Sequence, residues 1–168
     1  AALSYHTGTT AVLGGYSIDS LKSPRPDESV MLAKKVAKEM GKASNGRTFR
    51  FRKNLYPVEG VDQDWMRHKH GVIALLIEAS RGSPVGWCAR KNAVIPGRKA
   101  WMALVDELAS GPLISGRATR NDGEATTVPV SVVGQQTFNS EIWTSRPRDG
   151  RFFRFLSAGQ DTLLVAGK

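Results

Sequence analysis

An uninterrupted apolar run, Val72 to Ile77, sets the architecture of this chain more than any other stretch, and the carboxylate of Glu78 follows it directly. The run is far too short to span a bilayer. It is typical of a central strand that is covered on both faces. Such a strand needs neighbours on both edges to pair its backbone groups. The sequence therefore predicts a sheet with this run near its centre.

Two amphipathic helices are expected to cover such a sheet. Asp27 occupies an N-cap position and Gly41 a C-cap position, and between them apolar residues recur at helical spacing: Val30, Ala33, Val36, Ala37 and Met40. A second helix is predicted over 98–109, where Trp101, Leu104, Val105 and Leu108 share one face. Short strands are predicted at Ala2 to Tyr5 and Phe49 to Leu55, and an ordered loop at 56–65. Together these elements predict an α/β layered domain over residues 1–110.

The pattern changes at Ser110-Gly111-Pro112. Downstream, turn signals such as Asp149-Gly150 separate short alternating segments. These predicted strands are Leu113 to Thr119, Val128 to Val133, Ile142 to Ser145, Phe152 to Leu156 and Thr162 to Val165. We therefore expect a small all-β antiparallel sandwich over residues 111–168, which could be incomplete at its end.

Composition excludes several classes of protein. Among 168 residues there is a single cysteine, Cys88, so the chain has no internal disulfide framework and no cysteine-based zinc cluster. Neither a phosphate-binding loop nor a dinucleotide-binding fingerprint is present, and no signal peptide indicates a compartment. The net charge of +9 favours a solvated basic face, densest at Lys42, Arg47, Arg50, Arg52 and Lys53, over nucleic-acid binding.

Three residues are candidates for a functional site because of their side-chain chemistry and their position relative to the predicted strands. Glu78 closes the buried strand, where loss of hydration favours proton uptake, so it is a candidate general base; the alternative is a carboxylate paired with a basic side chain. His6 directly follows the first predicted strand and is either a hydrogen-bonded core histidine or a metal ligand. Tyr56, in the loop, is either a mobile phenol or a packing residue.

The order and spacing of several motifs resemble the second half of a zinc metallocarboxypeptidase. Four segments carry the likeness: Tyr56-Pro57-Val58-Glu59-Gly60-Val61-Asp62-Gln63-Asp64-Trp65, Gly71-Val72-Ile73, Ile77-Glu78 and Ser4-Tyr5-His6-Thr7. The segment after residue 111 resembles the transthyretin-like domain that follows the catalytic domain in one branch of that family. The resemblance covers nearly the whole chain.

The resemblance implies a role for each motif residue. His6 would be a zinc ligand, and Glu78 the general base that later returns its proton to the leaving amine. Tyr56 would lie over the terminal residue of a peptide substrate and donate a hydrogen bond. Gln63 would contact the last side chain of the substrate, and Asp64 would support this pocket; many members of that branch prefer a basic terminal residue.

One part of the family pattern is missing. The first two zinc ligands of the family come from a His-x-x-Glu segment upstream, and no such segment occurs in this sequence. A catalytic zinc site needs about three protein ligands. We therefore expect zinc and peptide hydrolysis only together with an amino-terminal half, and the absence of an initiator methionine fits a missing upstream segment. The alternative is a catalytically inactive carboxypeptidase-like subunit of a larger, organellar or RNA-containing assembly.

Overall fold

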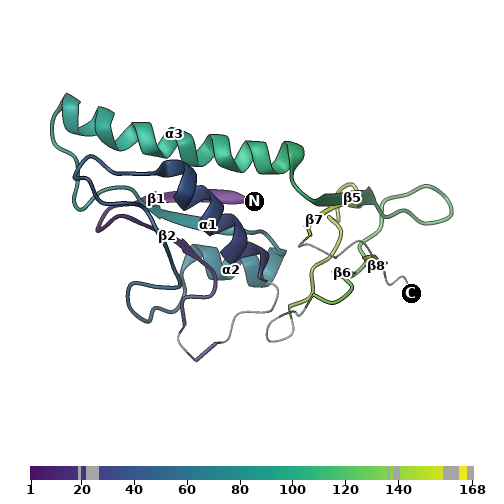
Figure 1. Ribbon diagram of the computed structural model, residues 1–168. Helices are drawn as coiled ribbons and strands as arrows, with labels where there is room; N and C mark the ends of the chain where they lie inside the picture. Colours follow the sequence, from purple (N-terminus) through teal and green to yellow (C-terminus); the bar gives the residue numbers. More distant parts are fainter. Residues whose placement is uncertain (19, 22–26, 136, 138–140, 157–162, 166–168) are drawn as a thin grey trace.

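The chain is a mixed α/β protein with one mixed sheet and three helices, as a computed structural model shows (Figure 1). The structure describes residues 1–168 except 19, 22–26, 136, 138–140, 157–162 and 166–168. Its helices are α1 (Glu28–Met40), α2 (Asp62–His70) and α3 (Trp87–Ser110). Its strands are β1 (Ala2–His6), β2 (Ala11–Gly14), β3 (Phe51–Arg52), β4 (Ala74–Glu78), β5 (Leu113–Arg117), β6 (Val130–Val132), β7 (Arg151–Phe155) and β8 (Leu163–Val165).

The predicted central strand lies inside the four-stranded sheet, which has the order β1-β4-β2-β3. Strand β4 pairs parallel with β1 and antiparallel with β2, while β3 is parallel to β2. All residues of β4 are buried except the half-buried Leu76. The expectation of neighbours on both edges of this strand is thus confirmed, because β1 and β2 satisfy its backbone groups.

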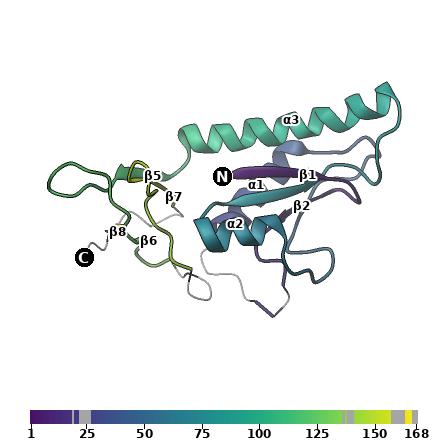
Figure 2. The ribbon, with the colours of Figure 1, turned by 180° about the vertical axis from the view of Figure 1, so that it is seen from behind.

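Helices α1 and α3 pack against each other and enclose the main core together with the sheet. The Asp27 side chain caps α1 by accepting a hydrogen bond from the backbone N–H of Val30, and Gly41 ends the helix with φ of 69°, as predicted. Helix α2 packs against β4 and lies on the near side of the sheet in Figure 2, where α1 is on the far side. The core thus forms between α1, α3 and one face of the sheet.

Two helices differ from the sequence-based expectation. Helix α3 begins at Trp87 rather than at 98 and contains Pro96. Its first part is mostly exposed, so it shows no apolar period. Helix α2 replaces the latter part of the predicted loop, and its buried residues are polar: Gln63, Asp64 and Arg67. Hydrophobic periodicity cannot detect a helix whose buried face is polar. No helix in the described part of the chain is long and apolar enough to cross a bilayer.

After α3 the chain forms two antiparallel strand pairs, β5 with β7 and β6 with β8. This β-rich segment extends beyond the end of α3 in Figure 1. The predicted strand at Ile142 to Ser145 is wrong as a full strand, because only an isolated bridge between Pro129 and Thr144 forms there. Residue 162, the predicted start of the last strand, is outside the described residues. A separate small core holds this segment together: Ala118, Val128, Val130 and Phe152.

Candidate active site

The parallel pairing of β1 and β4 places His6 opposite Glu78 at the ends of the two strands. The His6 Nδ1 atom lies 3.6 Å from the Glu78 Oε1 atom. Exposure differs sharply between the two, since the His6 side chain is 67% exposed and that of Glu78 only 6%. The two residues predicted to carry the chemistry are therefore brought together, with the carboxylate buried behind the imidazole.

The carboxylate of Glu78 is incompletely satisfied. Its Oε2 atom is buried and has no hydrogen-bond partner among the described residues. The backbone of Gly8 passes so close that a Cβ atom there would lie 3.1 Å from Oε2. A buried polar atom without a partner is costly in a folded protein, and one explanation for it is a catalytic role or a bound water or ion. Glu78 thus has the free acceptor that a general base needs.

A cavity of about 360 Å³ opens beside this pair. Of the residues predicted for the site, His6, Tyr56, Gln63 and Glu78 all line it; the other lining residues are Ser4, Leu13, Ser17, Asn54, Leu55, Val58, Val61, Asp62 and Leu76. Tyr56 is 68% exposed, whereas Gln63 is 2% exposed. The Oε1 atom of Gln63 is a second buried acceptor with no partner in the described part of the chain. The cavity is therefore lined by an exposed phenol and by two residues, Gln63 and Glu78, that each carry a buried unsatisfied acceptor.

Asp64 does not line the cavity, although the sequence pattern grouped it with substrate-binding residues. Its carboxylate accepts hydrogen bonds from the Ser17 backbone N–H at 3.0 Å and from the Ser17 hydroxyl at 2.7 Å. Burial raises the pKa of the Asp64 carboxyl, and the hydrogen bonds from Ser17 and the nearby charge of Arg67 oppose this rise. Asp64 therefore positions Ser17, which does line the cavity.

Sequence reasoning did not find Ser17 and Asn54, both of which line the cavity. The Asn54 side-chain amide donates to the Ser17 backbone carbonyl at 2.6 Å. Neither residue lies in a motif or follows a predicted strand, so no local pattern marks them. Only the tertiary pairing of β2 with β3 and the seating of α2 bring them together.

Zinc, which the family resemblance implies, requires more ligands than this site provides. His6 offers one exposed imidazole, but within the described residues no three His, Cys, Asp or Glu side chains form a metal-binding group. Because catalytic zinc is held by about three protein ligands, the described residues do not hold the ion by themselves. His6 fits as one ligand of a site that other residues would have to complete.

Comparison with known proteins adds no family to this geometry: no model of a known protein family matches the sequence, and no curated protein matches it.

Proposed function

We propose that this chain is the carboxy-terminal part of a zinc-dependent carboxypeptidase that releases the last residue of peptides, with Glu78 as its general base. The observation that carries the proposal is the carboxylate of Glu78, a residue that lines the cavity: its Oε1 atom lies 3.6 Å from His6 Nδ1, and its buried Oε2 atom has no hydrogen-bond partner among the described residues. A general base needs an oxygen that is free to take a proton.

In this proposal Glu78 takes a proton from the attacking water and later passes it to the leaving amine of the cleaved peptide. The Glu78 side chain is only 6% exposed, so bulk water has little access to the carboxylate. Gly8 leaves room in front of the carboxylate, because a side chain at this position would crowd Oε2. When bound, zinc would polarise the scissile carbonyl and acidify the water.

The cavity also fits the terminal residue of a substrate. Tyr56 at the rim can fold over this residue and donate a hydrogen bond. The unpaired Gln63 Oε1 atom is an acceptor for an ammonium or guanidinium group, which supports a basic terminal side chain. The Ser17–Asn54 pair keeps the wall in place.

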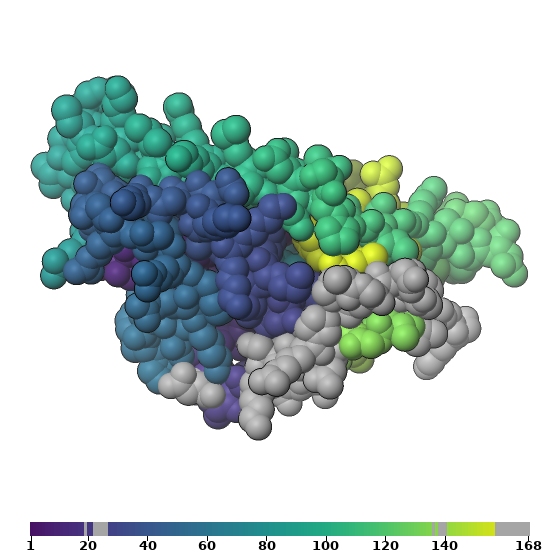
Figure 3. All heavy atoms as spheres, in the orientation of Figure 1, coloured from purple at the N-terminus to yellow at the C-terminus, as the bar shows by residue number. Residues whose placement is uncertain are grey.

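An amino-terminal half would complete the zinc site and cover an apolar surface next to it. Among the described residues no strand pairs with the outer edge of β1. On α3, a stripe of exposed apolar residues follows helical spacing: Val94, Trp101, Val105 and Leu108. Tyr5 of β1 joins these features by donating to the Gly97 carbonyl at 2.9 Å. Exposed apolar surface on one helix face is typical of a partner site, and helix α3 lies along the upper side of the molecule (Figure 3).

For the segment after α3 we propose a transthyretin-like sandwich. Two antiparallel strand pairs and a separate apolar core support this assignment. The alternation of buried and exposed residues along β6 and at the start of β7 is that of strands with one covered face.

The test uses the protein isolated from its native source. Its intact mass and zinc content should reveal the amino-terminal half and about one ion per molecule, and it should hydrolyse peptides that end in lysine. Glu78→Gln should lower kcat about a thousandfold with zinc content unchanged. The matched control Glu124→Gln alters an exposed carboxylate and should leave kcat unchanged. Wild-type turnover by Glu78→Gln would overturn the assignment of the base.

A second candidate is a catalytically inactive subunit of a larger assembly. Two observations favour it: no metal-binding group of three exists among the described residues, and four exposed basic residues lie close in sequence on β3 and the loop before it: Lys42, Arg47, Arg50 and Arg52. Such a basic surface would dock onto RNA or an acidic protein. Native protein that lacks both zinc and hydrolytic activity would decide for this candidate and against the first.

A further inference from the structure

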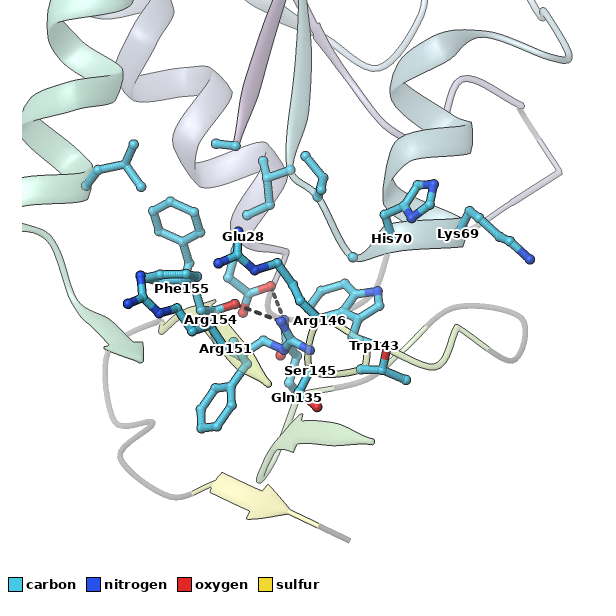
Figure 4. A pocket seen from close by; sticks show the side chains of 18 of the residues that line it. Glu28, Lys69, His70, Gln135, Trp143, Ser145, Arg146, Arg151, Arg154 and Phe155 are labelled. Carbon is cyan, nitrogen blue, oxygen red and sulfur yellow. Dashed lines mark hydrogen bonds between the residues drawn. The ribbon is translucent and has the colours of Figure 1, made fainter. Parts of the chain in front are cut away.

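A second, larger cavity of about 560 Å³ lies where the α/β part meets the β-rich segment. We call it the junction cavity. From the α/β part it is lined by Ala1, Glu28, residues 69–73 and Leu108, and from the β-rich segment by Gln135, residues 143–147 and residues 151–155. Figure 4 shows its labelled side chains, with the arginines of the β-rich segment gathered close to Glu28. It shares no lining residue with the candidate active site.

The junction cavity contains a buried cation whose hydrogen-bonding capacity is not used up. Arg154 is 5% exposed; its Nε and Nη1 atoms donate to the carbonyls of Val130 and Phe153. In the described part of the chain, the buried Nη2 atom has no hydrogen-bond partner, and no carboxylate there forms an ion pair with this guanidinium. Burial lowers the pKa of Arg154 to about 10, so the side chain stays charged at pH 7. An unpaired buried charge is costly unless something compensates it.

The other residues that line the junction cavity restrict the shape and the charge of a ligand that could bind there. Trp143 and Phe152 are 8% and 9% exposed, and the Arg154 guanidinium lies 5.2 Å from the centre of the Trp143 ring. Basic side chains outnumber acidic ones on the lining, with Lys69, Arg146, Arg151 and Arg154 against Glu28. The Glu28 carboxylate on the same cavity disfavours ligands with several negative charges. Aromatic walls around one buried guanidinium therefore suit an anion with a single charge and an apolar body.

We propose that the junction cavity binds a small organic carboxylate with an aromatic or aliphatic body, whose carboxylate pairs with Arg154 and whose body packs against Trp143 and Phe152. Guanidinium and carboxylate groups form strong charge-assisted hydrogen bonds. A ligand of this kind would also contact both parts of the chain and hold them together. The site is independent of the proposed peptidase activity, and the failure of one does not affect the other.

Calorimetric titration of the full chain with 3-phenylpropionate tests this proposal. Binding is expected, while the uncharged 3-phenylpropanamide and inorganic phosphate should each bind at least tenfold more weakly. Arg154→Met should lower the affinity at least tenfold. The matched control Arg120→Met removes an exposed arginine outside the cavity and should leave the affinity within twofold.

A filling variant separates ligand contact from folding. Leu108 lines the cavity and is 39% exposed, so a larger side chain can be placed there. Leu108→Trp keeps Arg154 in place; it should block ligand binding and leave the thermal unfolding midpoint unchanged. Equal binding of the propionate and the amide, or unchanged affinity in both Arg154→Met and Leu108→Trp, would overturn the proposal. Tighter binding of phosphate than of the propionate would overturn the ligand class.

Discussion

Arg67 of α2 forms a buried ion pair with Glu141 of the β-rich segment, with 3.3 Å between Nε of the arginine and Oε1 of the glutamate. The two side chains are 3% and 0% exposed. Arg67 also pairs with Asp27 at 3.0 Å, and the Tyr16 hydroxyl donates to Glu141. One guanidinium thus connects the α1 cap, helix α2 and the segment that follows α3.

Removing one partner from this buried network should be strongly destabilising. Arg67→Met leaves the carboxylates of Asp27 and Glu141 buried without their cation, and we expect the free energy of unfolding to fall by about 3 kcal/mol. Arg120→Met breaks only an exposed pair with Asp122 and should change it by less than about 1 kcal/mol. Urea denaturation measures the free energy of unfolding of both variants. Equal losses would show that the buried network stabilises the protein no more than the exposed ion pair does.

Gly71 should be sensitive to any side chain. It ends α2 with φ of 62°, and a Cβ atom there would lie 2.6 Å from Cγ of Trp143. Gly71→Ala therefore combines left-handed strain with a collision and should cost at least about 2 kcal/mol. Gly46→Ala is the matched control, because Gly46 has φ of 78° but open space around it. It should cost only about 1 kcal/mol, and equal losses in thermal denaturation would refute the collision.

Gln63 should set the preference for the terminal residue if the chain is part of a carboxypeptidase. Gln63→Leu removes the unpaired buried Oε1 acceptor at similar side-chain volume. We expect kcat/KM for peptides ending in lysine, relative to those ending in leucine, to fall about tenfold, which corresponds to the loss of one hydrogen bond. The measurement is competitive hydrolysis of the two peptides by the native protein, and an unchanged ratio would remove Gln63 from the substrate pocket.

The apolar stripe on α3 should be covered in the native protein if an amino-terminal half is present. Trp101 is 48% exposed and Met102 64% exposed in the chain described here. Hydroxyl-radical footprinting should therefore modify Trp101 readily in the isolated chain and at least fivefold more slowly in native protein. Trp65, which is 58% exposed on α2, is the internal control. Equal modification of Trp101 in both samples would contradict a partner on this surface.

Asp149 should contribute to stability only above acidic pH. A hydrogen bond from the Arg151 backbone N–H, helped by Arg146, holds the pKa of Asp149 below its ordinary value of 3.8. The contribution is therefore fully present above pH 3.8 and is lost as the pH falls through the lowered pKa. Asp149→Asn keeps the acceptor and removes the charge. Its deficit in free energy of unfolding should be constant from neutral pH down to about pH 4 and shrink below that value. A deficit that does not change with pH would contradict a lowered pKa.

The sequence was sufficient for elements whose buried face is apolar. The run that ends at Glu78 predicted β4 and its two neighbours, and Asp27 and Gly41 predicted both ends of α1. The free energy gained by burying apolar side chains is proportional to the area buried and does not depend on which residue covers it. A helix or strand with an apolar buried face therefore shows apolar residues at regular spacing in the sequence. The grouping of His6 with Glu78 followed from motif order, and the strand register places them opposite each other.

Only the tertiary structure decided the rest. Helix α2 buries Gln63, Asp64 and Arg67, and polar burial is stable only where specific partners such as Ser17 and Glu141 satisfy it. Those partners are distant in sequence, so no local sequence pattern predicts them. The same holds for Arg154, whose sequence context is that of an ordinary β-strand. The sequence by itself determined which strand is central and which residues carry reactive groups. The packing of distant segments determined which polar groups are satisfied and which, like Glu78 Oε2 and Arg154 Nη2, have no hydrogen-bond partner among the described residues.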